Sequence, residues 1–143
     1  GGLGMATFLD YYRKKIQPRV MAADLFLKTE QEPYALHQAL DILQMSQAAA
    51  QHTLQQEIHG SLTKAQFIRL LCDGKTAFCR MFARELRCGL PAYYTPAQIS
   101  YIYDLDVALV EQAAAPTGLV ICTRRLLPLV FSAIDLSQTQ YRL

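Results

Sequence analysis

Residues 34–71 have the sequence YALHQALDILQMSQAAAQHTLQQEIHGSLTKAQFIRLL, and residues 94–131 have the sequence YTPAQISYIYDLDVALVEQAAAPTGLVICTRRLLPLVF. Laid over each other without a gap at an offset of 60 residues, the stretches share one apolar pattern and five identities, namely Tyr34/Tyr94, Gln38/Gln98, Ile42/Ile102, Ala48/Ala108 and Thr63/Thr123. The predicted helix starts also coincide, because Ser46 lies opposite Asp106. Start signals and apolar spacing are independent constraints, so their agreement indicates an internal repeat. The alternative is a chance match between two helical pairs of similar length.

The apolar spacing around these stretches is helical, and it predicts a mainly α fold with little or no β structure. Residues 6–28 have helical periodicity interrupted at Pro18, so two helices or one kinked helix are expected there. Further helices are predicted over about 35–44, 47–57, 64–71, 76–88, 96–103 and 107–115. A last helix is expected to run to about 134, either from Thr123 or from Leu126 or Leu127 with Pro128 in its first turn. The best strand candidate is Gly118–Cys122.

These elements predict five segments along the chain. They are residues 1–4, interpreted as remnants of an expression vector before a natural start at Met5, an N-terminal helical segment (5–33), a first repeat (34–72), a basic linking helix (73–93) and a second repeat with a tail (94–143).

The composition favours a soluble protein of one domain or two very small ones. The chain has 143 residues, of which 52% are hydrophobic and 18% are charged. Its apolar runs, at 119–122 and 126–131, are far below the roughly 18 residues that a membrane span needs. No secretory leader is recognised and the cysteines lack C-x-x-C spacing, so we expect a cytoplasmic protein.

Signatures of catalysis are missing from the sequence. It contains no glycine-rich phosphate loop and no G-x-S-x-G motif, and the histidines form no ligand pair. We therefore expect no metal, no cofactor, no small-molecule ligand and no enzymatic activity.

Each repeat has the apolar spacing of a helix-turn-helix unit. In the second repeat Ile99 lies on the first helix, Leu105 fills the turn and Val110 faces back from the second helix. Ala39, Met45 and Ala50 take the same places in the first repeat, whereas Gln44 and Asp104 occupy the turn site where glycine is common. The stretch 35–71 resembles the excisionase and mercury-resistance-regulator branch of the helix-turn-helix proteins. This resemblance implies a DNA-binding, transcription-regulatory protein.

If the resemblance holds, the second helix of each pair would enter the major groove. In the first repeat its outward side chains, predicted as base contacts, are Gln47, Gln51, His52 and Gln55. An ordinary solvated face is the alternative. In the second repeat the carboxylates of Asp106 and Glu111 would repel phosphates, which favours packing or dimer formation there.

The net charge of +2 conceals two basic blocks, with +3 over residues 1–23 and +4 over residues 64–87. We predict phosphate contacts from the basic side chains of these blocks, namely Arg13, Lys14, Lys15, Lys75, Arg80, Arg84 and Arg87. Alternatively, these groups pair with acidic residues. In the helix over 76–88 the predicted buried stripe is Cys79, Phe82, Ala83 and Leu86.

Two functions from different classes remain. The first is a small protein that binds double-stranded DNA through a helix-turn-helix. The second is a helical module that has lost DNA binding and buries its surface against a protein partner or in a homodimer.

Overall fold

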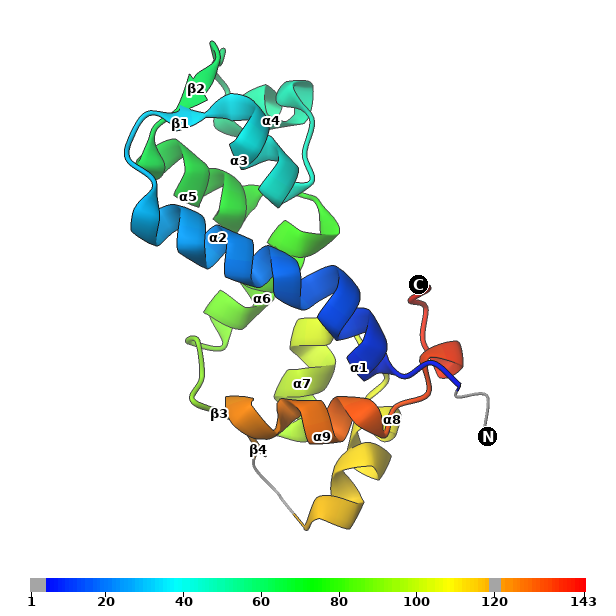
Figure 1. The fold of residues 1–143 in the computed structure, drawn as a ribbon. Coiled ribbons are helices and arrows are strands. Elements are labelled where there is room, and N and C mark those ends of the chain that lie inside the picture. Colours follow the sequence, from blue (N-terminus) through cyan, green and yellow to red (C-terminus); the bar gives the residue numbers. More distant parts are fainter. Residues whose placement is uncertain (1–4, 119–121) are drawn as a thin grey trace. The chain divides into compact units, whose positions relative to one another are not determined.

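Helical backbone dominates the computed structural model, which describes residues 5–118 and 122–143 (Figure 1). The mainly α fold predicted from the sequence is confirmed, and the described strands are two short antiparallel pairs. The chain divides into two compact units, one formed by Pro18–Arg84 and the other by Glu85–Leu143 with the residues up to Gln17.

The N-terminal helix stays helical from Phe8 to Thr29, although Pro18 lies inside it. Its parts are α1 (Phe8–Tyr11), the π-helical turn η1 (Tyr12–Ile16) and α2 (Gln17–Thr29). Proline lacks an N–H, and its ring collides with the carbonyl four residues before it. The backbone widens just before Pro18, where the Gln17 N–H donates to the Tyr12 carbonyl five residues back. The expected interruption is thus one wide turn within a continuous helix.

The first copy of the repeat lies within the Pro18–Arg84 unit. Its elements are β1 (Tyr34–Ala35), α3 (Leu36–Leu43), α4 (Gln47–Leu54), β2 (Ser61–Leu62) and α5 (Lys64–Asp73). The first predicted helix pair is confirmed, although α4 ends at Leu54 and not near Glu57, because Gln55 turns into the left-handed region.

The second copy lies within the unit that contains the C-terminus. Its elements are β3 (Tyr93–Tyr94), α7 (Pro96–Tyr103), α8 (Val107–Ala114), the 3₁₀ turn η2 (Ala115–Thr117), β4 (Cys122–Thr123), the 3₁₀ turn η3 (Arg124–Leu126) and α9 (Leu127–Ser132). Of the predicted strand Gly118–Cys122, residues 119–121 lie outside the described residues, and Cys122 begins β4. The last helix takes the later of its two predicted starts, with Pro128 in its first turn. A 3₁₀ turn, η4 (Leu136–Gln138), lies near the C-terminus.

The two copies match at the offset of 60 residues that the sequence predicts. The strand partners are Tyr34 and Leu62 in one copy and Tyr94 and Cys122 in the other. Ser46 and Asp106 cap α4 and α8 by accepting backbone N–H bonds, from Ala49 and Ala108 respectively. Strands β1, β2 and β3 were not predicted, because two residues are too few to show a period of two.

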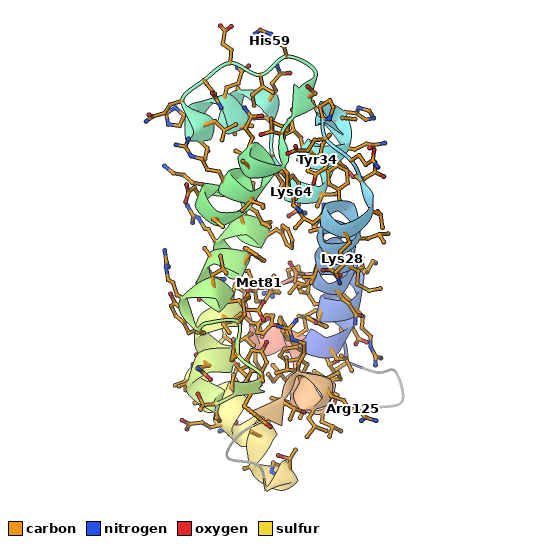
Figure 2. The ribbon with its side chains drawn as sticks, turned by 90° about the vertical axis from the view of Figure 1, so that its left-hand side faces the viewer. Lys28, Tyr34, His59, Lys64, Met81 and Arg125 are labelled. Atoms are coloured by element: carbon orange, nitrogen blue, oxygen red, sulfur yellow. The ribbon has the colours of Figure 1, made fainter. Side chains whose placement is uncertain are left out.

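Each compact unit has its own aromatic core, and the N-terminal helix supplies a ring to both. In the Pro18–Arg84 unit, Phe26 lies 4.5 Å from Tyr34 and 5.3 Å from Phe67 between ring centroids. Figure 2 labels this buried Tyr34. In the other unit, Phe8 lies 4.9 Å from Phe131 in an edge-to-face arrangement.

The predicted buried stripe of α6 (Ala77–Arg87) is wrong in part. Cys79 is buried as expected, but Phe82 and Ala83 are only half-buried, and Leu86 is 36% exposed. The buried positions are instead Phe78, Cys79, Met81 and Glu85. The apolar pattern missed this stripe because its last member is a carboxylate, whose partners are described below.

We expect Gln55→Gly to stabilise the protein, because Gln55 has a φ of 56°. The left-handed region costs a non-glycine residue roughly 1–2 kcal/mol. Part of that gain is offset by the extra freedom of glycine in the unfolded chain, so the free energy of unfolding should rise by about 0.5–1 kcal/mol. Gln56→Gly is the matched control, since Gln56 is exposed and is not among the residues with positive φ. Urea unfolding measures both, and a loss of stability in Gln55→Gly would contradict the assigned backbone.

Candidate functional site

The turn between α3 and α4 is anchored by side chains from α2 and from the segment before α6. Gln44 begins this turn with left-handed backbone, at a φ of 58°, and Asp104 does so between α7 and α8, at a φ of 52°. From α2, Arg19 Nη1 donates to the Asp41 carbonyl at 2.7 Å. From the segment before α6, Thr76 Oγ1 donates to the Leu43 carbonyl at 2.9 Å. Carbonyls at the end of α3 thus have partners, which fixes the direction in which α4 begins.

Gly74 allows the buried side of this turn to pack closely. A Cβ atom at Gly74 would lie 2.5 Å from the Leu70 carbonyl oxygen and 2.6 Å from Met45 Cε. Met45 is the middle residue of the turn and is buried. Any side chain at position 74 would therefore collide with the backbone of α5 at Leu70 and would push aside the end of the Met45 side chain.

Two of the four predicted base contacts bond to the loop that follows α4. Gln47 Nε2 donates to the Ile58 carbonyl at 3.1 Å. The Ile58 N–H in turn donates to Gln51 Oε1 at 3.1 Å. Of the other two, Gln55 is the exposed residue that follows the last residue of α4, and His52 is exposed on the helix itself. The structure thus separates the predicted set into two residues whose side chains bond to the loop and two whose side chains make no hydrogen bond to a described residue.

The corresponding face of α8 has a different chemistry. Val107 and Glu111 stand at the positions of Gln47 and Gln51, and the Val107 side chain is 43% exposed. Asp106 and Glu111 are both exposed. The two second helices therefore share a backbone but present a neutral polar face in one copy and an apolar, acidic face in the other.

Most of the predicted phosphate contacts lie at the surface. Arg13, Lys14 and Lys15 are exposed on the π-helical turn, and Lys75 and Arg80 are exposed around the start of α6. Within residues 5–118 and 122–143 these five cations have no ion-pair partner. Arg84 is half-buried, and Arg87 donates to the Tyr101 hydroxyl at 3.2 Å.

Two ion pairs lie on helices α2 and α5. Lys28 pairs with Asp24 at 2.9 Å on α2, and Arg69 pairs with Asp73 at 3.8 Å on α5. Lys28 and Lys64, at the start of α5, are labelled in Figure 2. Both pairs are solvent-exposed, and such pairs contribute roughly 1 kcal/mol or less.

A buried polar cluster in the C-terminal unit was missed by the sequence analysis. Glu85 Oε1 accepts from the Tyr94 hydroxyl at 2.7 Å and from Arg124 Nη2 at 2.6 Å, and Arg124 Nη2 also donates to Tyr94 at 2.8 Å. The Glu85 side chain is 10% exposed and that of Arg124 is 57% exposed. These bonds link Glu85 on α6 to β3 and η3, so the cluster serves as a structural cross-link. In the sequence, the one sign of this cluster is the position of Glu85, which lies seven residues after Phe78 and so on the same face of an arginine-rich helix.

Burial raises the pKa of Tyr94, and the bond to the Glu85 carboxylate raises it further. Burial is also the main cause of the raised pKa of Tyr103. The thiols of Cys79 and Cys122 are likewise buried, which raises their pKa. Neither thiol has the lowered pKa that marks a reactive cysteine.

The residues that the structure describes contain neither a metal-binding cluster nor a helix that could span a membrane. No group of three or more His, Cys, Asp or Glu side chains there is placed to hold a metal ion. In the same residues no helix has both the length and the apolar character needed to cross a membrane.

The free energy of unfolding should fall as the pH rises above 10.0, the ordinary pKa of a tyrosine side chain. The unfolded chain ionises its tyrosines first, because the folded pKa values of Tyr94 and Tyr103 lie higher. Their contribution is therefore full below pH 10 and is lost as the pH rises through the folded values, by at most about 1.4 kcal/mol per pH unit for each group. Urea unfolding between pH 9 and 11.5 should give a shallower decline in Tyr94→Phe. The exposed Tyr93→Phe is the control, and equal slopes in both variants would refute the assignment.

The turns between α3 and α4 and between α7 and α8 both begin with left-handed backbone, at Gln44 and Asp104. Comparison with protein-family models, with curated proteins and with solved structures found no match.

Proposed function

We propose that this chain binds double-stranded DNA through its first repeat copy, with α4 as the helix that enters the major groove. The observation that carries the proposal is the pair of helices α3 and α4, joined by a three-residue turn that begins with left-handed backbone at Gln44. A helix pair of this kind presents its second helix to the major groove in helix-turn-helix proteins. Arg19 and Thr76 hold this turn, so α4 is presented rigidly.

Charge supports the first copy over the second. The α4 helix carries no carboxylate, and the nearest acid after it, Glu57, lies 3.5 Å from His59 Nε2. On α8, by contrast, Glu111 and the cap Asp106 would face the phosphates, at a cost in binding.

The phosphate contacts in this proposal come from exposed cations. Lys75 and Arg80 belong to the same compact unit as α4 and lack ion-pair partners among the described residues. Arg84 belongs to that unit as well, whereas Arg13, Lys14, Lys15 and Arg87 belong to the other. The proposed protein is cytoplasmic, regulates transcription and is not an enzyme.

A specific observation favours a second function for the second copy. The Val107 side chain is 43% exposed at the start of α8, beside the exposed carboxylates of Asp106 and Glu111. An exposed apolar side chain beside carboxylates is better matched to the surface of a protein partner than to the negatively charged phosphates of DNA. The alternative function is therefore a contact between α8 and a protein partner or a second copy of this chain.

Binding of a fluorescein-labelled duplex of random sequence, followed by anisotropy at rising salt, tests the DNA proposal. We expect affinity to fall as salt rises, because cations on the protein displace counterions from the DNA. Arg80→Ala should weaken binding about 3–10-fold and reduce the slope of log K against log salt by about 1. Lys28→Ala is the matched control, since Lys28 is also exposed but is paired with Asp24.

Two results would count against the proposal. One is the absence of duplex binding even at low salt. The other is an equal loss of affinity in Lys28→Ala and Arg80→Ala, which would show that only total charge matters.

A further inference from the structure

The side chains of Gln47 and Gln51 bond to both backbone polar groups of one residue, Ile58, in the loop after α4. Gln47 Nε2 donates to the Ile58 carbonyl, and Gln51 Oε1 accepts from the Ile58 N–H, each at 3.1 Å. Gln47 Nε2 also lies 3.4 Å from Gln51 Oε1. We call these three residues the Ile58 clamp. The loop backbone dictates which end of each amide faces it, so neither amide is free to flip.

The clamp rests on a fixed point, because the side chain of Ile58 is buried and only 3% exposed. The packing of this side chain anchors the backbone of Ile58 in the core. An amide that reads adenine must offer both its oxygen and its nitrogen to the base edge. The three bonds of the clamp use both hydrogens of Gln47 Nε2 and both lone pairs of Gln51 Oε1, so at least one of these bonds would have to break for either side chain to do so.

The side chain of His52 is not bonded to the loop. It is exposed one turn beyond Ala48 on α4, and its imidazole makes no hydrogen bond to any residue that the structure describes. An imidazole N–H donates to acceptors, and guanine presents two of them, N7 and O6, in the major groove. The Ala48 methyl group suits an apolar contact with the methyl group of thymine.

We propose that Gln47 and Gln51 are positioning residues, and that His52 is the side chain through which α4 selects a base, with guanine as its partner. This inference rests on the proposed DNA-binding function. It assigns separate roles to side chains of α4 that the sequence predicted to be base contacts alike.

The second copy supports this division of roles. Val107 stands where Gln47 stands in the first copy, and a valine side chain cannot donate a hydrogen bond. Glu111 replaces Gln51, which removes the amide and adds a charge. The clamp therefore belongs to the copy whose second helix is free of carboxylates.

The positioning role is tested by amide hydrogen exchange at Ile58, followed by NMR on the full chain. Gln51→Glu keeps an acceptor for the Ile58 N–H, whereas Gln51→Met removes it. We expect exchange as slow as in the natural chain for Gln51→Glu and about 2–10-fold faster for Gln51→Met. Equal exchange in all three proteins would overturn the clamp.

The reading role is tested by selecting bound duplexes from a pool with a randomised central segment. His52→Ala should lose the preference for guanine at one position by about 5-fold or more, while its affinity for random duplex changes less than about twofold. His59→Ala is the matched control, because His59 lies at the loop tip in Figure 2, is exposed and faces Glu57. Gln51→Met should weaken the preference at several positions together, because α4 and its loop are no longer held.

The outcomes separate this inference from the proposed function. If no duplex is selected from the pool, the DNA-binding function fails and the reading role fails with it. If duplexes are selected but His52→Ala keeps the same preferences, DNA binding stands and the reading role is wrong. A change at one position in Gln51→Met, with Ile58 exchange unaltered, would likewise overturn the inference by making Gln51 the base contact.

Discussion

The packing of one aromatic ring from the N-terminal helix into each core is the constraint on which both units depend. Phe26 from α2 completes the cluster with Tyr34 and Phe67, and Phe8 from α1 completes the cluster with Phe131. Phe8 is fully buried and Phe26 is 7% exposed. Burying such a ring contributes roughly 1.5–3 kcal/mol, which is a large share of the stability of a small unit. The π-helical turn before Pro18 keeps the helix continuous between these two rings.

The two repeat copies show how one backbone can carry two surfaces. The turn residues Gln44 and Asp104 adopt the same left-handed conformation, and Ser46 and Asp106 both cap the helix that follows. These features depend on the backbone and on short polar side chains, and so they tolerate a change of the outward residues. Neutral amides on α4 and carboxylates beside α8 therefore suit different partners, which is the basis of the functions proposed for the two copies.

The buried stripe of α6 illustrates the limit of an apolar pattern. The buried residues Phe78, Met81 and Glu85 have helical spacing. A prediction that counts only apolar residues excludes Glu85 and therefore places the buried face at Phe82 and Leu86. Glu85 is tolerated in the interior because Tyr94 and Arg124 donate to it. Arg124 lies 39 residues after Glu85, so a short window of sequence that contains Glu85 does not contain Arg124.

The sequence by itself determined the helices, their caps and the offset of 60 residues between the copies. It did so because a capping box such as Thr63 with Gln66 forms between residues three apart, and because the apolar period is local. The tertiary structure alone decided which side chains are free to act. Gln47 reaches Ile58 across 11 residues and Arg19 reaches Asp41 across 22, and polar groups that look outward on an isolated helix are satisfied by these contacts. The physical reason is that a hydrogen-bonding side chain takes whichever partner the folded chain brings near, and helical spacing does not specify that partner.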